Sequence, residues 1–114
     1  MLSKINRFHG HNSLNYVYNR GVTVRSPYCA MKAVKGKKDS YRIAVVVSKK
    51  VAKSAPHRNR IRRRVYEVIR TLAPGILTNQ DIVVSVFDER FLTIDYKDLK
   101  ESIKRQLTEI TDKT

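Results

Sequence analysis

The 114-residue chain is poor in several residue types, and each shortage argues against a class of protein. Cys29 is its only cysteine, so neither an intrachain disulfide nor a zinc site built from several cysteines is expected. The longest purely apolar run covers residues 43–47, far short of the ~20 residues that a membrane-spanning helix needs. Residues 1–12 lack the apolar core of a secretion signal. We therefore expect a cytoplasmic protein without a membrane segment.

Acidic residues are also scarce: 10 Asp and Glu stand against 24 Lys and Arg, and the formal net charge is +14. The imbalance is concentrated in the first half of the chain, where Asp39 is the only acid among residues 1–64. Such a surface favours a polyanionic partner, either nucleic acid or an anionic membrane. Because the basic helix described next lacks exposed Trp or Phe anchors, a membrane surface is the weaker of the two.

The most informative segment is residues 47–72, which reads VSKKVAKSAPHRNRIRRRVYEVIRTL. It combines the end of an apolar strand, a Lys-Lys step, a turn and a basic amphipathic helix. At ~100° per residue, one face of this helix carries an apolar stripe. The stripe consists of Ile61, Val65, Val68, Ile69 and Leu72. The remaining faces are crowded with arginines that repel one another, whereas a merely solvated face would mix charges, so we expect an external polyphosphate partner.

The other patterns predict one α/β domain over residues 1–114, with residues 1–12 as a flexible basic segment. We expect a short helix capped by Ser13, strands over residues 22–24, 28–34, 41–48 and 81–87, and a hairpin loop over residues 36–40. The β-branched residues of 41–48 predict a central strand covered on both faces. The basic helix is expected to begin between Ser54 and His57 and to end before Pro74, which makes a parallel βαβ pair with the following strand.

A last helix is predicted after an N-cap at Thr93 or Asp95. Its apolar face is formed by Leu99, Ile103, Leu107 and Ile110. The charged residues on its other faces mix signs, as on an ordinary solvated helix.

Several function classes find little support in these residues. His9 and His11 have no third ligand at a useful spacing, so no metal site is predicted. The acids of the second half lie at strand and helix ends, where capping explains most of them, and they do not form the carboxylate cluster of a metal-dependent nuclease. A DNA-binding helix-turn-helix would need a short helix just before the basic one. A non-enzymatic RNA-binding protein of ribosomal type stays open.

The chain contains, in this order, SLNYVYNRG, RIAVVVSKK, HRNRIRRRVYEVIR, DIVVSVF and FLTIDYKDL. With these segments, the Arg58-Asn59-Arg60 triplet and the Lys49-Lys50 step, it resembles the protein subunit of bacterial ribonuclease P over nearly its whole length. The resemblance implies a two-layer α/β (α+β) sandwich with a four-stranded mixed sheet. It also implies the element order α-β-β-β-α-β-α, a likeness to a ribosomal protein domain, and a left-handed βαβ crossover through the basic helix.

The resemblance further implies a role in a ribonucleoprotein endoribonuclease that removes 5′ leaders from precursor tRNAs. The protein itself would be non-catalytic. Its partners would be the catalytic RNA and the precursor tRNA, without a membrane and without a required oligomer. The holoenzyme would need Mg²⁺ bound mainly by RNA.

Residue by residue, the resemblance implies two binding regions. The predicted contacts to the RNA subunit are Lys49, Lys50, Lys53, Arg58, Asn59, Arg60, Arg62, Arg63 and Arg64. Asn59 either touches RNA or orients an arginine, and both interpretations stay open. A cleft for the single-stranded leader is predicted around Leu14 and Tyr18, with Tyr28 and Lys32 nearby. Leu14 stands where the family often has Phe, and an aliphatic side chain cannot stack on a base as Phe does.

Overall fold

The computed structural model describes residues 6–8 and 11–114, and in the first helix it describes side chains from residue 14 onward. The elements follow in the order α1 (His11–Arg20), β1 (Val22–Arg25), β2 (Cys29–Lys35), β3 (Arg42–Val47), α2 (Ala55–Leu72), η2 (Ala73–Gly75), β4 (Gln80–Val86), η3 (Glu89–Leu92) and α3 (Tyr96–Lys113). The predicted order α-β-β-β-α-β-α is confirmed, with two short 3-10 helices, η2 and η3, on either side of β4.

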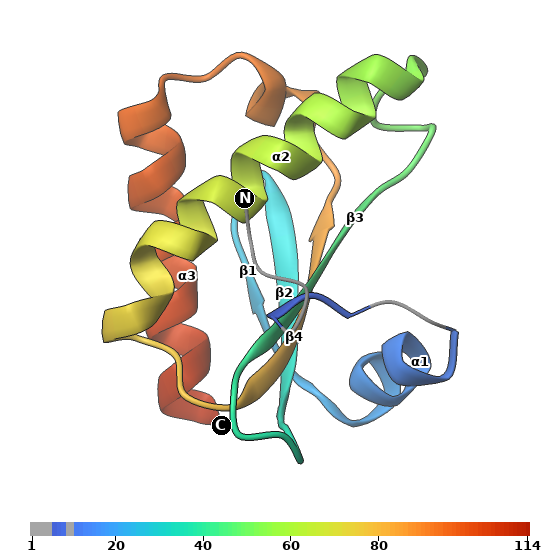
Figure 1. Cartoon of the computed structure of the whole chain (residues 1–114). Coiled ribbons are helices and arrows are strands. Elements are labelled where there is room, and N and C mark those ends of the chain that lie inside the picture. The colour runs from blue at the N-terminus through green and yellow to red at the C-terminus, as the bar shows by residue number, and fades with distance from the viewer. Residues whose placement is uncertain (1–5, 9–10) are drawn as a thin grey trace.

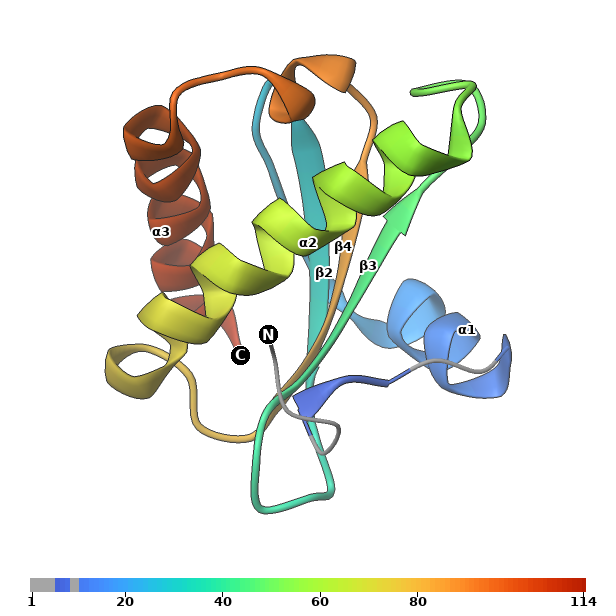
Figure 2. The same cartoon turned by 45° about the horizontal axis from the view of Figure 1, so that its top comes forward.

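The four strands form one mixed sheet in the order β1-β2-β4-β3. β2 pairs antiparallel with β1 and with β4, whereas β3 and β4 run parallel, so the predicted parallel βαβ pair is confirmed. With the strands vertical and α2 toward the viewer, β4 lies to the left of β3 (Figure 1, Figure 2). The crossover through α2 is therefore left-handed, the rare hand for such connections.

Helices cover both faces of the sheet: α2 and α3 lie over one face, and α1 packs on the other (Figure 1, Figure 2). Side chains of a strand alternate between faces, so Ile43 and Val45 enter the α2/α3 core while Ala44 and Val46 face α1. The predicted helix stripes are also confirmed. The buried aliphatic residues are Ile61, Val65, Val68 and Ile69 of α2, with Leu72 partly buried, and Leu99, Ile103, Leu107 and Ile110 of α3.

The prediction of a central position for residues 41–48 is wrong, because β3 is an edge strand. Its apolar character is still explained, since both of its faces are covered. Its outer backbone edge is also satisfied: the Phe8 N–H donates to the Ile43 carbonyl at 3.1 Å, and the Val45 N–H donates to the Tyr66 hydroxyl at 3.1 Å. Residues 6–8 and α2 thus protect an edge that would otherwise be open for pairing.

The hairpin predicted over residues 36–40 is also wrong. β4 lies between β2 and β3, so the loop joins two strands that are not neighbours. The physical reason is the burial of β4, which is buried at every position except Ser85 and therefore takes an inner place in the sheet. The loop is held at the start of β4 by the Gly36 N–H, which donates to the Asn79 carbonyl at 2.9 Å.

The helix boundaries largely follow the predictions. α2 has Ser54 at its N-cap position and proline in its first turn, and it ends at Leu72, before Pro74. Asp95 occupies the N-cap position of α3. α1, however, begins at His11, so Ser13 lies inside the helix and is not its cap. A preference for Ser at an N-cap is worth only ~1 kcal/mol, which the rest of the helix can override. The prediction of a flexible segment falls partly on residues 1–5 and 9–10, which lie outside the described residues.

Gly21 marks the tight passage from α1 into β1, and its size is the constraint. A Cβ there would come within 2.6 Å of the Val17 carbonyl oxygen and 3.0 Å of the Ala33 carbonyl oxygen, both of them backbone atoms. We predict that Gly21→Ala lowers the free energy of unfolding by about 1–3 kcal/mol, measured by urea denaturation. Gly75→Ala is the matched control, since nothing lies within 4 Å of its Cβ. Equal stability of the two variants would contradict the packing argument.

Candidate nucleic-acid interface

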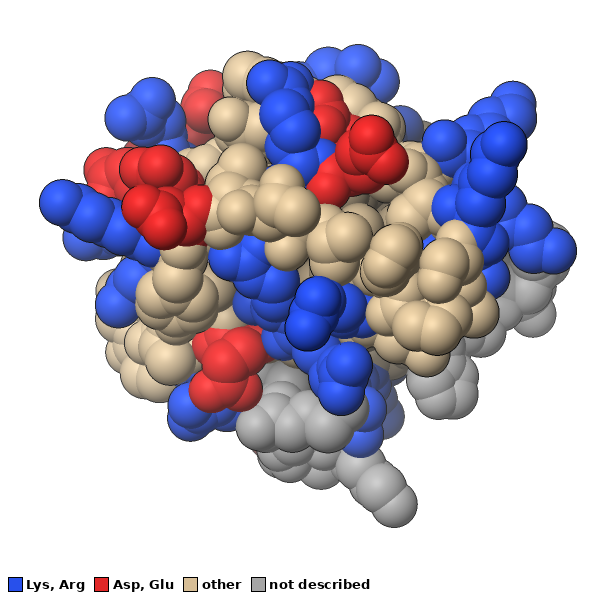
Figure 3. Space-filling view, turned by 90° about the horizontal axis from the view of Figure 1, so that it is seen from above, with Lys and Arg blue, Asp and Glu red and all other residues tan. Residues whose placement is uncertain are grey.

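The turn after β3 and the first half of α2 present an exposed basic surface. We define this basic surface by Lys49, Lys50, Lys53, Arg60 and Arg63, all of them exposed. The turn brings three lysines close to the start of α2, where free backbone N–H groups add positive potential. Seen from above, Lys and Arg side chains gather where α2 begins and continue along the helix (Figure 3).

Arg60 and Arg63 are the arginines of α2 that are best placed to bind an external partner. Neither guanidinium forms a hydrogen bond or ion pair with the part of the chain that the structure describes. The two arginines are three positions apart, so they lie near one another on the helix and repel. Both groups can donate planar, paired hydrogen bonds, a geometry that suits phosphate oxygens.

The other arginines of the segment are held within the protein. Nη1 of Arg58 donates to the carbonyls of Ala52 and Lys53, each at 2.9 Å, and so fixes the turn before α2. Arg64 donates to the carbonyls of Phe91 and Ile94, each at 2.6 Å, and so joins α2 to η3. These two arginines therefore shape the surface on which Arg60 and Arg63 are displayed.

Asn59 interacts with a neighbouring arginine: its Oδ1 accepts a hydrogen bond from Nη2 of Arg62, one helical turn further on. Of the two interpretations left open for Asn59, this contact favours the one in which it orients an arginine. The same contact directs the guanidinium of Arg62 along the helix surface.

Glu67, the only acid of the basic segment, lies towards the other end of the helix. Its carboxylate pairs with Arg70 at 2.5 Å, and this hydrogen-bonded guanidinium lowers the pKa of Glu67 to about 2. The acid therefore stays ionised at all ordinary pH values and offsets the charge of Arg70. Glu67 also lines one hollow together with Arg60 and Arg63, so this single carboxylate lies close to three arginines and leaves the surface with a net positive charge.

A groove leads from the basic surface to the edge of β3. It consists of two hollows of ≈ 550 and ≈ 500 Å³ that share Arg7 and Tyr66 in their walls. The first hollow also contains Asn59, Arg62 and Arg63 of α2, and the second contains Leu14 of α1. The Nε of Arg7 is buried there and has no hydrogen-bond partner within residues 6–8 and 11–114. The groove thus connects the two predicted binding regions around the edge of the sheet.

On the α1 face, the structure brings together three of the four residues predicted for the cleft. Leu14 packs against the small cluster around Phe8 and Ala44. The Tyr18 hydroxyl lies 3.3 Å from the Ser85 hydroxyl of β4. Nζ of Lys32 donates to the Tyr18 carbonyl at 3.1 Å and lies 5.8 Å from the centre of the Tyr18 ring. Tyr18 is thereby fixed with a cation beside its ring.

Tyr28 is separated from the other three. It precedes β2 and packs on the α2/α3 side, where its ring stacks on Phe91 with a 5.0 Å centroid distance and Arg90 lies 4.9 Å above it. Because Tyr28 stands outside the strand, strand alternation does not determine where its ring points. Tyr28 thus lies apart from Leu14, Tyr18 and Lys32, the other residues predicted for the cleft.

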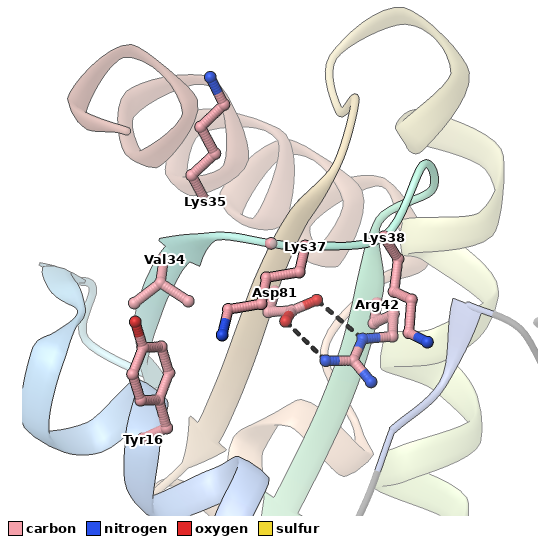
Figure 4. A pocket seen from close by; sticks show the side chains of 8 residues that line it. Tyr16, Val34, Lys35, Lys37, Lys38, Arg42 and Asp81 are labelled. Carbon is pink, nitrogen blue, oxygen red and sulfur yellow. Dashed lines mark hydrogen bonds and ion pairs between the residues drawn. The ribbon is translucent and has the colours of Figure 1, made fainter.

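A second basic pocket lies on the α1 side, where β2 ends and β3 begins. Its centre is a two-pronged pair in which Nε and Nη2 of Arg42 bind the two Asp81 oxygens at 2.9 and 2.7 Å. The Asp81 carboxylate raises the pKa of Arg42 by this hydrogen bonding. Figure 4 shows the pair between the side chains of Lys37 and Lys38, with Tyr16 of α1 on one side. The pocket's carboxylate is therefore neutralised, and the surface around it stays positive.

Metal-ligating residues are dispersed in the described part of the chain, where no three His, Cys, Asp or Glu residues are placed to hold a metal ion. His9 lies outside the described residues. Cys29 is buried, and its thiol donates to Oε1 of Gln106 at 3.0 Å. Burial raises the pKa of Cys29 to about 11, so the thiol stays protonated. No helix among the described residues is long and apolar enough to cross a membrane.

Comparison with known proteins agrees with this arrangement of an exposed basic helix over a mixed sheet. The family model for ribonuclease P matches residues 2–111. The chain belongs to the ribonuclease P protein family. Members of this family are the protein component of the ribonucleoprotein endoribonuclease that processes the 5′ ends of precursor tRNAs. The predicted family and function are confirmed.

Individual ribonuclease P proteins support the assignment. The ribonuclease P protein component of Clostridioides difficile is 37% identical over 94 residues, covering 78% of this chain and 81% of the relative. That of a Pseudanabaena species is 36% identical over 87 residues, covering 75% of both. The solved ribonuclease P protein of Thermotoga maritima superposes with a TM-score of 0.78 at 26% identity, covering 85% of this chain and 90% of that one. The Staphylococcus aureus protein gives 0.79 at 21% identity over 91% and 94%, which shows the shared fold.

Sequence reasoning on this ribonuclease P protein missed Arg7 and Tyr66 as groove residues. Arg7 sits in a segment that carries no periodic pattern, so no local signal places it beside β3. Tyr66 lies outside the apolar stripe of α2. An aromatic residue with a hydroxyl group on an otherwise basic face of the helix is the one feature of the sequence that could have indicated a role for it. Its hydroxyl reaches the edge of β3, which only the folded structure reveals.

The internal and exposed arginines can be separated by stability. We predict that Arg64→Ala lowers the free energy of unfolding of the free protein by about 1.5–3 kcal/mol, since two hydrogen bonds from a charged group are lost. Arg63→Ala is the matched control and should change stability by no more than about 0.5 kcal/mol. Denaturant unfolding of both variants measures the difference. If the Arg64→Ala variant were as stable as Arg63→Ala, the contacts of Arg64 to η3 would not contribute to the free energy of unfolding.

Proposed function

We propose that this ribonuclease P protein uses its two positive regions for two different RNAs. The basic surface, with Lys49, Lys50 and Lys53 on the turn and Arg60 and Arg63 on the helix, binds the catalytic RNA of ribonuclease P, and the neighbouring Arg62 adds a further contact. Arg58, Asn59 and Arg64 support this surface from within. The cleft of Leu14, Tyr18 and Lys32 holds the single-stranded 5′ leader of the precursor tRNA. Tyr28 has no part in that cleft.

The observation that carries the first half of the proposal is the pair of guanidinium groups on Arg60 and Arg63, which have no partner among the described residues. Guanidinium groups without protein partners bind phosphates at little cost, because they give up only water and counterions. Binding of RNA there also removes the repulsion between the two arginines. A rigid helix supports the contact, since its apolar stripe is fixed in the core.

The second half rests on Tyr18 and Lys32. A partly buried aromatic ring with a cation beside it suits an unpaired nucleotide, whose base stacks on the accessible part of the ring while its phosphate meets the charge. Binding the leader would position the scissile phosphate near the catalytic RNA. The protein's contribution is binding and positioning, and RNA supplies the reacting groups, with Mg²⁺ held mainly by RNA.

The positive charge of the protein bears on the magnesium requirement. Two large RNAs repel each other, and a cationic protein between them lowers the concentration of divalent ions needed to hold them together. The cytoplasm, where tRNA is processed, is the expected location, and one copy of the chain per catalytic RNA suffices for this role.

The salt dependence of RNA binding tests the basic surface. We predict that Arg60→Ala and Arg63→Ala each weaken binding to the catalytic RNA and reduce the slope of log affinity against log salt by about 1. Filter binding or fluorescence anisotropy over a series of salt concentrations measures both quantities.

Arg105→Ala serves as the control for this series, because Arg105 is an exposed arginine on α3, away from the basic surface. It should leave the slope unchanged. If all three variants gave the slope of the unmodified protein, α2 would not be the phosphate-binding helix.

The complete proposal is tested by cleavage of precursor tRNA at low Mg²⁺ concentration with the catalytic RNA alone, the protein alone, and both together. We expect efficient cleavage only with both, and recovery of RNA-alone cleavage when Mg²⁺ is raised. Cleavage by the protein alone would overturn the non-catalytic role. No stimulation of the RNA, with general RNA binding intact, would overturn the subunit role.

A further inference from the structure

Phe87 is a large aromatic side chain whose exposure neither the core nor the cleft described above explains. It follows β4, and 47% of its surface is exposed. Its backbone remains in register, because the Phe87 N–H donates to the Tyr28 carbonyl at 3.0 Å. Val84 of β4 and Val24 of β1 point into the α2/α3 core, so alternation within the strands places Ser85 and Arg25 on the α1 face. The Arg25 guanidinium lies 6.0 Å from the centre of the Phe87 ring, which places this ring on the side of Arg25. Phe87 therefore shares a face with the cleft.

The strand registers fix what lies around Phe87 on that face. Arg25 of β1 is opposite Ala30 of β2, and Ala30 is opposite Ser85 of β4, so these three residues form one row across the sheet. Phe87 is one pleat beyond this row, about 7 Å from Ser85 along the strand. Lys32 is one pleat before it, on β2.

Two aromatic rings, each with a cation beside it, lie next to this row. Ala30 is small and only 8% exposed, and the Ser85 hydroxyl lies 3.3 Å from the Tyr18 hydroxyl. On one side stands Tyr18 with Nζ of Lys32 at 5.8 Å from its ring, and on the other stands Phe87 with the Arg25 guanidinium at 6.0 Å from its ring. Each of the two aromatic rings is thus paired with a cation, and Ser85 contributes a hydroxyl to the same face of the sheet.

We propose that Phe87 and Arg25 form the second wall of the leader cleft, with an unpaired leader base stacked on Phe87 and a neighbouring phosphate bound by Arg25. This inference rests on the proposed function, because it assumes that the leader occupies the α1 face. It also accounts for Leu14: the aromatic contact that this aliphatic residue cannot make is supplied from the far side of the cleft.

Charge favours RNA as the occupant over an apolar protein segment. The cations that face the cleft are Arg25 and Lys32, and the lysines of the basic surface follow β3, which runs parallel to β4 and ends at the same edge. The nearest acid along the chain, Asp88, is bound by Arg90 at 2.6 Å. The acids that share a hollow with Arg25 are Asp98, Glu101 and Glu109, and they belong to α3, which covers the other face of the sheet (Figure 1). A flexible, negatively charged strand with stackable bases fits an aromatic and cationic cleft.

The test measures the affinity of the holoenzyme, assembled with its catalytic RNA, for precursor tRNA with a leader and for mature tRNA. Phe87→Ala should weaken binding of the precursor about 5- to 100-fold, the range of one lost base stack, and leave mature tRNA unaffected. Phe87→Trp should restore precursor binding. Since the chain has no other Trp, quenching of this indole by the leader reports stacking directly.

Two controls separate stacking from loss of structure. Tyr96→Ala removes a side chain of similar exposure, 48%, from the start of α3, and should not alter the preference for the precursor. In a series of precursors, each lacking one leader base, Phe87→Ala should have no effect on binding when the missing base is the one that stacks on Phe87. At the other positions the effect should persist.

The outcomes distinguish this inference from the proposed function on which it rests. If Tyr18→Ala selectively weakens precursor binding and Phe87→Ala does not, the leader occupies the cleft but not its second wall, and the inference is overturned alone. If neither variant distinguishes precursor from mature tRNA, the leader does not bind this face. Equal loss for both tRNAs on Phe87→Ala would also overturn it, since the ring would then act on assembly.

Discussion

Burial of β4 is the constraint on which the rest of the structure depends. This strand is apolar on both faces, with Ile82 and Val84 in the α2/α3 core and Val83 beneath α1. It is stable only with cover on both sides, and it lies between β2 and β3. The chain leaving β3 must therefore cross over the sheet before it can enter β4, and α2 is that crossing. The location of the arginine-rich helix thus follows from apolar burial, and charge determines only which of its faces meets solvent.

Once α2 is in place, its arginines divide by the acceptors within their reach. Arg58 and Arg64 find backbone carbonyls, which a guanidinium can bind through several N–H groups without a carboxylate partner. These contacts fix the turn and η3 against the helix. Arg60 and Arg63 find no such acceptor among the described residues and stay available. A cation on a fixed helix loses less conformational freedom on binding than one on a mobile loop, so the internal arginines also strengthen the external contacts.

The sequence predicts the elements and their apolar faces well, because a period of 2 or 3.6 residues is a local property. Strand order is not a local property. The same alternation of apolar residues fits a sheet in which β2 and β3 pair through a hairpin at residues 36–40 and a sheet in which β4 lies between them. The site shows the same division. Arg60 and Arg64 look alike in sequence, and only carbonyls 27 and 30 residues away make Arg64 internal. Tyr28 and Phe87 flank strands, and the ring of Tyr28 turns to one face while that of Phe87 turns to the other.

The two regions lie on opposite faces of the sheet and use different physics. The phosphate contacts proposed for α2 depend on charge, which every RNA carries, so they would give affinity without distinguishing a precursor from a mature tRNA. Stacking in the cleft requires unpaired bases, which the leader has and a folded tRNA end does not present in the same way. The groove with Arg7 and Tyr66 passes around the edge of β3 between them. In the function proposed above, one small domain holds the catalytic RNA by charge and selects its substrate by stacking, because β4 forces cover onto both faces of the sheet.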